Sequence, residues 1–286
     1  MKYRSPAKIN LGIEVLGKRD DGYHEIRTLF QSIDFSDVLE FLPLAGRGIR
    51  LRGTEPSIPW DETNLIHRAA RLLQQDFPEA GGADIRVTKN VPAGKGLGGG
   101  SANAAMTLFA LNGLWELGLP LGRLREYGRR LGADVPYFLE GGLCLGEGRG
   151  DELNPLPDLP VHFCVLALPS FPILTSEIYG RLRLTSPAKD SKMSRFLERR
   201  EFGLLENRLE ETVFSLYPRL KTLKSSFLQL GAVLSLVSGT GSAVFGLFED
   251  REKAERSLAE IGRTEEALLA ETLSRERYWK RATAGV

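Results

Sequence analysis

The feature that most constrains this chain is a glycine-rich loop, VPAGKGLGGGSANAA, at residues 91–105. Five of the seven residues from Gly94 to Gly100 are glycine, and they separate a strand-like run from a helix-like run. Glycine allows positive φ angles and lets a ligand approach the backbone amides closely. A helix starting near Ser101 would direct its free N–H groups and positive dipole end at the loop. The pattern therefore predicts a phosphate site, with a flexible connector capped by Ser101 as the structural alternative.

Two common phosphate motifs fit this loop poorly. The Walker pattern is absent because Lys95 is followed by Gly96. The GxGxxG pattern is met by Gly94, Gly96 and Gly99, but a dinucleotide fold also needs a second strand that ends in an acid about 20 residues further on. Residues 114–131 instead continue as leucine-rich helical sequence. A dinucleotide-dependent oxidoreductase is therefore a remote alternative.

The charge balance excludes two classes of partner. The 38 Lys and Arg residues against 37 Asp and Glu give a net charge of +1, which supplies no global field for nucleic acid or an anionic membrane. The uncharged stretch 225–248 contains four Gly and six Ser or Thr, which makes it too polar to span lipid. Cys144 and Cys164 lie in apolar runs, and the N-terminus lacks an apolar signal region. We expect buried thiols in a cytoplasmic protein with neither nucleic acid nor membrane as a partner.

Hydrophobic periodicity predicts an α+β chain. Ile9, Leu11 and Ile13 alternate with polar residues, which indicates a strand with Lys8 and Asn10 on one face. Further strands are expected over 37–42, 49–52, 85–91, 161–168, 233–237 and 243–248, with helices from about 63, after the glycine loop, between 176 and 230, and over 251–261. Residues 266–274 fit a strand better than a helix, and the proline-rich stretch 149–160 reads as a linker. Two α+β domains follow.

Three more segments, read with the glycine loop, carry a family resemblance. They are SPAKINLGIEVLGKRDDGYHEI at 5–26, LGADVPYF at 131–138 and VSGTGSAVF at 237–245. In this order the four segments resemble the motifs of the GHMP small-molecule kinases. The resemblance implies an N-terminal ribosomal-protein-S5-domain-2-like domain over 1–153 that binds ATP. It also implies a C-terminal ferredoxin-like α/β sandwich over 154–286 that binds the substrate.

The resemblance also implies an activity and cofactors. The DGYHEI and GADVPYF segments are most similar to family members that phosphorylate a hydroxyl on the methylerythritol part of a cytidine diphosphate conjugate, in non-mevalonate isoprenoid synthesis. ATP and Mg²⁺ would be the cofactors, and a monomer or weak homodimer is expected. No acidic Mg²⁺ ligand is identified, so nucleotide phosphates and water would hold the metal. A kinase of the homoserine or mevalonate type, and a catalytically silent relative, are the alternatives.

Two residues match the catalytic positions of the family. Lys8 would stabilise negative charge on the transferring phosphoryl group, and Asp134 would take the proton of the attacking hydroxyl. Each of these two residues also has a purely structural alternative. Lys8 could be an ordinary exposed lysine, and Asp134 precedes Val-Pro as a helix N-cap would.

The resemblance also implies which residues bind the phosphoryl acceptor. Tyr23 and His24 would hold the cytosine by stacking and hydrogen bonding, and Tyr179 would supply a second aromatic face. The structural alternative is a core tyrosine beside a surface histidine. The complete set of acceptor positions is Asn10, Tyr23, His24, Asp134, Tyr179, Gly239, Thr240 and Gly241, the last three forming a glycine turn that could equally be a plain hairpin turn.

The nucleotide positions include the loop and two residues outside it. They are Asn64, Lys89, Pro92, Gly94, Gly96, Leu97, Gly98, Gly99, Gly100, Ser101 and Ala102. Asn64 and Lys89 would lie near the adenine, although each alone is an ordinary polar residue. Ala102 replaces the usual second serine, Lys95 would either touch a phosphate or be solvated, and Arg208 replaces the aspartate of an Asn-Asp-Leu-Glu segment.

Overall fold

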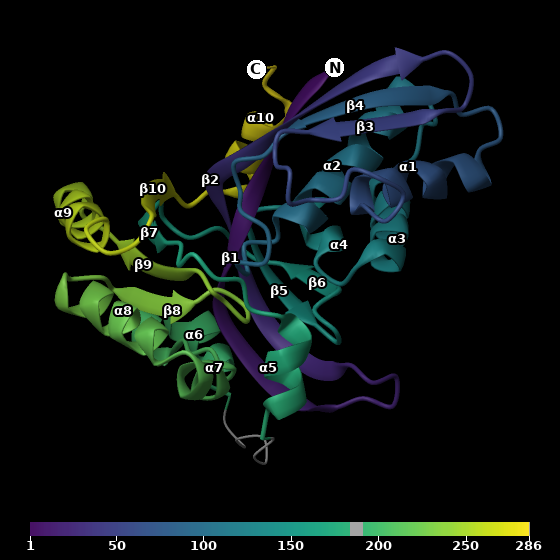
Figure 1. Ribbon diagram of the computed structural model, residues 1–286. Coiled ribbons are helices and arrows are strands. Elements are labelled where there is room, and N and C mark those ends of the chain that lie inside the picture. Colours follow the sequence, from purple (N-terminus) through teal and green to yellow (C-terminus); the bar gives the residue numbers. More distant parts are fainter. Residues whose placement is uncertain (184–190, 286) are drawn as a thin grey trace.

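The computed structural model describes residues 1–183 and 191–285, which build two β-sheets with helices around them (Figure 1). The first sheet contains β1 (Lys2–Lys18), β2 (His24–Leu44), β3 (Ile49–Gly53), β4 (Gly82–Thr88), β5 (Leu143–Glu147) and β6 (Glu152–Pro155). The second contains β7 (Phe163–Ala167), β8 (Leu234–Val237), β9 (Val244–Phe248) and β10 (Ala267–Glu271). The α+β, two-sheet architecture agrees with the predicted fold class.

The long antiparallel hairpin of β1 and β2 connects the two sheets. β2 pairs with β1 along one edge, and with β4 and β5 along the other. The predicted alternation along β1 is confirmed: Ile9 and Leu11 are buried in a cluster that includes residues of the second sheet. Lys8 and Asn10 share the other face, where their side chains are hydrogen bonded. β1 therefore contributes to the core and to the polar pocket described below.

Helices cover the first sheet on one side (Figure 1). They are α1 (Leu65–Asp76), α2 (Gly99–Leu114), α3 (Leu121–Leu131) and α4 (Val135–Phe138). Because α2 is followed by α3 and not by a strand, the topology disfavours the dinucleotide fold. The last helix, α10 (Arg275–Thr283), returns to this part of the molecule, where the Trp279 ring packs on Phe109 at a centroid distance of 5.0 Å.

The second sheet has the strand order β10-β7-β9-β8 and is antiparallel throughout. α8 (Pro218–Gln229) precedes β8, and α9 (Arg251–Ile261) joins β9 to β10, which gives the β-α-β-β-α-β order of a ferredoxin-like sandwich. α5 (Thr175–Arg181), α6 (Lys192–Arg199), the 3-10 helix η1 (Phe202–Leu204) and α7 (Glu210–Leu216) lie between β7 and α8 along the chain. The ferredoxin-like prediction is confirmed.

Several local predictions need correction. The proposed linker 149–160 contains β6, which pairs with β5 in the first sheet, so the prolines end an edge strand. The division at 153/154 stays a prediction and falls within β6. α2 begins at Gly99 and not at Ser101, and α10 was not expected. Residues 184–190, part of the stretch predicted as helices, lie outside the described residues.

Two further expectations concern burial and the membrane. Cys144 and Cys164 are free and fully buried, and burial raises the pKa of Cys144 to about 12. These are the buried structural thiols that were expected. In the part of the chain that the structure describes, no helix is long and apolar enough to cross a membrane.

Candidate active site

The glycine loop joins β4 to α2 with the predicted strand–loop–helix arrangement. Gly96 and Gly98 have φ angles of +76° and +71°, which L side chains rarely adopt. Gly98 is the N-cap residue of α2, so the cap is a left-handed glycine and not Ser101. The first turn of this 16-residue helix therefore leaves backbone N–H groups directed at the loop, as an anion site requires.

Lys8 lies directly beneath this loop. Its side chain is buried, and its Nζ donates to Asn10 Oδ1 at 2.6 Å and to the Gly96 carbonyl at 2.9 Å. Asn10 in turn donates to Thr28 Oγ1 at 2.8 Å. The interpretation of Lys8 as an ordinary exposed lysine is therefore wrong. The amine is held in a fixed position between β1 and the loop.

Asp134 faces Lys8 from the start of α4. Its Oδ2 lies 3.6 Å from Lys8 Nζ, and the carboxylate is about a third exposed (36%). The carboxylate accepts no capping hydrogen bond from α4, in contrast to the helix-cap alternative. Burial lowers the pKa of Lys8, and the nearby Asp134 opposes that shift. A buried amine and an accessible carboxylate are thus brought together across 126 residues of sequence.

The turn between β8 and β9 belongs to the second sheet and forms one wall of the pocket that contains Lys8. Gly239 and Thr240 line the pocket beside Lys8, while Gly241 faces the core next to Val237. Ser238 Oγ donates to the same Gly96 carbonyl that accepts from Lys8, at 2.8 Å. The turn is therefore both the hairpin connection and part of the site.

Asn207 positions this turn and was not assigned a role from the sequence. It is 3% exposed, and its Nδ2 donates to the carbonyls of Val237 and Gly239 at 2.9 and 2.7 Å. Glu210 accepts from the Val237 N–H at 2.9 Å and pairs with Lys224. The signal available in the sequence was the Asn-x-Leu-Glu segment itself, but its contacts depend on the tertiary fold.

Two connected cavities extend from the Lys8–Asp134 pair. A cavity of about 250 Å³ is lined by Lys8, Asn10, Ile13, Ile26, Thr28, Phe30, Gly96, Gly98, Asp134, Thr175, Tyr179, Leu209, Gly239 and Thr240. A second of about 680 Å³ contains Tyr23, His24 and Arg149, and shares Ile26, Asp134, Thr175 and Tyr179 with the first. One elongated acceptor of small-molecule size would fit across both.

Three aromatic residues predicted for the acceptor meet in the larger cavity. The rings of His24 and Tyr179 are tilted against each other at a centroid distance of 4.9 Å, so they already touch. Tyr23 is half exposed (53%) and lies under the guanidinium of Arg149, 5.0 Å from its ring centroid. Burial, followed by the charge of Lys18, lowers the pKa of His24, which favours a neutral imidazole. Arg149 and Thr175 were missed because neither forms a recognisable motif.

The nucleotide positions divide between a cavity and the loop. A cavity of about 310 Å³ is lined by Asn64, Lys89 and Gly100 together with Ser57, Ile58, Pro59, Trp60, Leu65, Ile66, Ala93 and Asn103. Asn64 Oδ1 caps α1 through the Ile66 N–H at 3.0 Å. Trp60 is the aromatic side chain of this cavity and was not identified from the sequence.

Lys89 and the other loop positions have mixed environments. The Lys89 amine forms a buried ion pair with Asp37, so its side chain also has a structural role. Leu97, Gly99 and Ala102 are buried, whereas Pro92, Gly94 and Ser101 retain exposed surface. The buried position of Ala102 in the core under α2 accounts for a small apolar residue there.

Of the two alternatives for Lys95, the solvated side chain is wrong. Its Nζ donates to the carbonyls of Pro169 and Phe171, the latter at 2.9 Å, and the side chain is 8% exposed. Burial lowers the pKa of Lys95. The side chain thus joins the glycine loop to the segment that precedes α5 and is not solvated.

The described residues contain no metal site built from protein ligands alone. Among residues 1–183 and 191–285, no three His, Cys, Asp or Glu side chains gather closely enough to hold a metal ion. The pocket beside the loop contains the single carboxylate of Asp134 among its lining residues.

Comparisons with known proteins agree with this geometry. Residues 64–142 match the family model of the GHMP kinases N terminal domain, and residues 193–266 match that of the GHMP kinases C terminal domain. The chain is 39% identical over 273 residues to a 4-diphosphocytidyl-2-C-methyl-D-erythritol kinase of Acaryochloris marina, covering 88% of each chain.

Solved structures show the same relationship. A crystal structure of 4-(cytidine 5'-diphospho)-2C-methyl-D-erythritol kinase superimposes with a TM-score of 0.82 at 35% identity, covering 95% of this chain and 99% of that one. A homoserine kinase from Cytophaga hutchinsonii has a TM-score of 0.77 at 19% identity, covering 96% and 94% of the two chains. The second likeness shows the fold alone.

Proposed function

The chain belongs to the GHMP kinase family, and we propose that it transfers the γ-phosphoryl group of ATP to a hydroxyl of 4-diphosphocytidyl-2-C-methyl-D-erythritol. The reaction would be a step of the non-mevalonate route to isoprenoid precursors. The observation that carries the proposal is the Lys8–Asp134 pair at 3.6 Å, placed where the glycine loop meets a cavity lined by Tyr23, His24 and Tyr179.

The residues support a simple division of roles. The hydroxyl oxygen of the acceptor forms a bond to the γ-phosphorus, the bond to the bridging oxygen of ATP breaks, and Asp134 accepts the hydroxyl proton. Lys8 lies close enough to stabilise the charge on the transferring group, and the loop amides with the N-terminus of α2 would hold the phosphates. A placed general base contributes about 10²–10⁴-fold in rate.

Mg²⁺ is proposed as part of the nucleotide complex. Among the residues that line the pocket, Asp134 is the one with a carboxylate. The ion would therefore be held mainly by phosphate oxygens and water. When bound, it supplies positive charge that neutralises the phosphates. The protein residues that orient the acceptor remain those of the two cavities.

The larger cavity supports the choice of acceptor. Tyr23 offers an exposed aromatic face for a base, and a neutral His24 can both donate to and accept from a pyrimidine edge. Homoserine and mevalonate lack a base and would leave this cavity unfilled. We propose a monomer or weak homodimer. We place the reaction in the cytoplasm, consistent with two free cysteines.

One assay tests the proposal directly. ADP release is measured with ATP and Mg²⁺ and, in separate reactions, with the cytidine conjugate, homoserine and mevalonate. We expect turnover with the cytidine conjugate only. Turnover of homoserine or mevalonate alone would reassign the substrate, and nicotinamide binding without ADP release would favour the oxidoreductase alternative.

A further inference from the structure

The short segment that connects β7 to α5 is attached to the glycine loop through Lys95. The Lys95 amine donates to two carbonyls of this segment, those of Pro169 and Phe171, the latter at 2.9 Å. Hydrogen bonds from an ammonium group are stronger than those between neutral groups. Within the part of the chain that the structure describes, Lys95 lines neither acceptor cavity nor the cavity of Trp60. Its side chain therefore serves the connection between the loop and the segment.

Two further hydrogen bonds hold the same segment. The Ile173 N–H donates to the carbonyl of Gly94, also in the glycine loop, at 3.4 Å. Ser242 Oγ, from the β8–β9 turn, donates to the Phe171 carbonyl at 2.6 Å. Among the described residues, three of the four hydrogen bonds that join residues 169–173 to other parts of the chain thus involve the glycine loop. The position of the segment depends mainly on that loop.

The segment leads directly into α5, which supplies two residues of the acceptor site. Thr175 lines both acceptor cavities, and the Tyr179 ring touches that of His24. Thr175 is only four positions beyond Phe171, whose carbonyl Lys95 holds. A change in the freedom of the segment therefore reaches the acceptor residues through a short length of chain.

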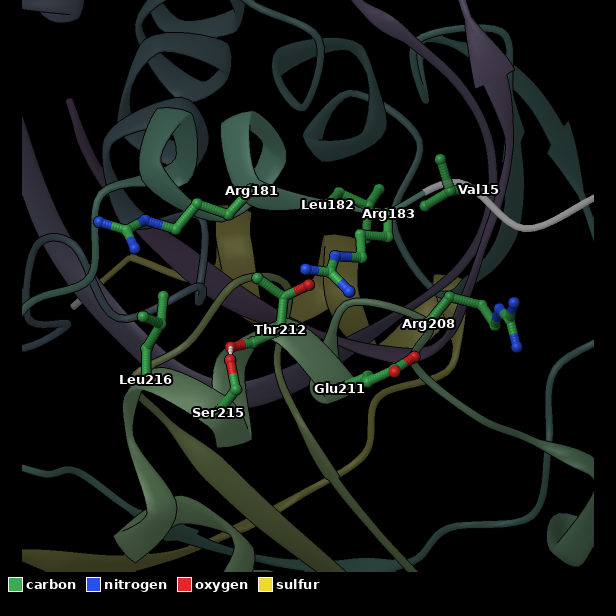
Figure 2. Close-up of a pocket in the computed structure, with 9 residues that line it drawn as sticks. All are labelled: Val15, Arg181, Leu182, Arg183, Arg208, Glu211, Thr212, Ser215 and Leu216. Atoms are coloured by element: carbon green, nitrogen blue, oxygen red, sulfur yellow. Dashed lines mark hydrogen bonds between the residues drawn. The ribbon is translucent and has the colours of Figure 1, made fainter.

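The far end of α5 has room to move. Ile178, in the middle of the helix, is fully buried with apolar residues of the second sheet. Beyond it lies a cavity of about 560 Å³, with Arg181 and Leu182 on one side and Thr212 and Ser215 of α7 on the other (Figure 2). Because side chains do not fill this space, the last turn of α5 is not packed closely on α7. The orientation of α5 depends on its buried middle and on the attachment at its start.

We propose that Lys95 is a positioning residue that couples nucleotide binding in the glycine loop to the order of α5, and thereby to the affinity of the acceptor cavity. A nucleotide held by the loop amides restricts the backbone of Lys95, and the two hydrogen bonds of its amine extend that restriction to the segment and α5. The acceptor then binds at a smaller cost in conformational entropy. The identity of the two ligands rests on the proposed function.

Hydrogen–deuterium exchange of the full chain, with and without saturating ADP, tests the coupling. We expect ADP to slow exchange of the α5 amides at least about fivefold in the unmodified chain and to leave them unaffected in Lys95→Met. Gln74→Leu also removes a buried side chain that donates to two carbonyls, and as the control it should keep the response of α5.

Two results of this experiment would overturn the proposal. One is an α5 response that is absent from the unmodified chain or retained in Lys95→Met. The other is faster exchange in α5 with ADP, because Lys95 would then leave the segment when the loop is occupied.

A second variant tests the same link with the hydrogen bonds of Lys95 in place, and it serves even if Lys95→Met does not fold. Leu174 is the N-cap residue of α5 and is 69% exposed, so Leu174→Gly makes the connection to α5 more flexible without removing a core contact. Most of the ADP response of α5 should be lost. Leu121→Gly, at the exposed start of α3, is the matched control and should retain it. Loss in both variants, or in neither, would contradict the proposal.

A calorimetric titration with cytidine diphosphate measures the effect on the acceptor cavity. The chain saturated with ADP should bind cytidine diphosphate at least about fivefold more tightly than the free chain, and Lys95→Met should bind it equally in both states. Equal affinities in the unmodified chain would overturn the proposal. Absence of any binding would instead count against the proposed acceptor, and the exchange experiment, which uses ADP alone, would still decide whether Lys95 couples the loop to α5.

Discussion

A Cβ atom on Gly96 would lie 1.9 Å from the backbone oxygen of Ser238, so the glycine loop and the β8–β9 turn are in backbone contact at this point. The carbonyl of Gly96 also accepts from Lys8 Nζ and Ser238 Oγ. Three segments distant in the sequence therefore meet at one glycine. The position of the Lys8 amine depends on how closely the two turns approach.

Substituting this glycine should separate the turns. In Gly96→Ala the new methyl group meets backbone rather than a flexible side chain, and its φ of +76° is strained for alanine. We expect a loss of about 1–3 kcal/mol in the free energy of unfolding and a reduction in kcat larger than this loss would explain. Urea unfolding and steady-state kinetics measure the two effects. Gly113→Ala, in α2 with open space around it, should unfold no more easily than the unmodified chain.

Asp134 can be tested with little effect on folding. Because it makes no capping bond with α4, Asp134→Asn should unfold at nearly the same urea concentration. If it is the general base, kcat falls at least about a hundredfold while ATP binding is nearly unchanged. Kinetics and a nucleotide titration are compared. A variant with ordinary turnover would remove Asp134 from the mechanism.

The acceptor affinity should depend on the protonation of His24. Its pKa is lowered by burial and by Lys18, so the ring stays neutral to below its usual pKa of 6.5 and is protonated only in more acid solution. KM for the acceptor should therefore rise below that pH, where the imidazole loses its acceptor lone pair. Lys18→Gln removes one of the two causes, so the rise should begin at a higher pH.

The His24 titration can be observed directly by NMR. The imidazole proton shifts should give a higher pKa in Lys18→Gln than in the unmodified chain. An unchanged titration, or a KM independent of pH in both proteins, would contradict the role given to His24.

Substitution of Asn207 tests whether this residue acts by positioning the β8–β9 turn. Asn207→Leu leaves the buried carbonyl of Val237 and the partly buried carbonyl of Gly239 without their amide donor, at a cost of about 1–3 kcal/mol for the buried one. Gln74 is a matched control, because its Nε2 also donates to two carbonyls, those of Arg47 and Gly81, away from the pocket. Both Leu variants should lose stability, but the Asn207 variant should also lose at least about tenfold in kcat. Equal kinetics in the two variants, at a temperature where both are folded, would reduce Asn207 to a structural residue.

The local patterns of the sequence predicted the elements well where the period was clear. The alternation along β1 placed Lys8 and Asn10 together. The strands of the second sheet lie where they were expected, over 161–168, 233–237, 243–248 and 266–274. The linker prediction failed because prolines in 149–160 are compatible with an edge strand, and β6 pairs on one side only within the described sheet.

The arrangement of the site depends on tertiary contacts that the spacing of residues along the sequence does not reveal. Nothing in the sequence pattern alone brings Asp134 to Lys8; that expectation came from the family resemblance. The solvated alternative for Lys95 was wrong because its acceptors, the carbonyls of Pro169 and Phe171, lie more than seventy residues away. Thr175 and Arg149 entered the cavities without any motif to mark them.

The double role of β1 limits how the site can open. Ile9 and Leu11 are buried between the two sheets. Lys8 and Asn10, on the same strand, line the pocket. A hinge that spread the two sheets would have to break the apolar contacts of β1 before it altered the distance between the loop and the amine. We therefore expect ligands to enter and leave by movement of the peripheral segments, the β1–β2 hairpin tip and α5, while Lys8 and Asn10 keep their positions on β1.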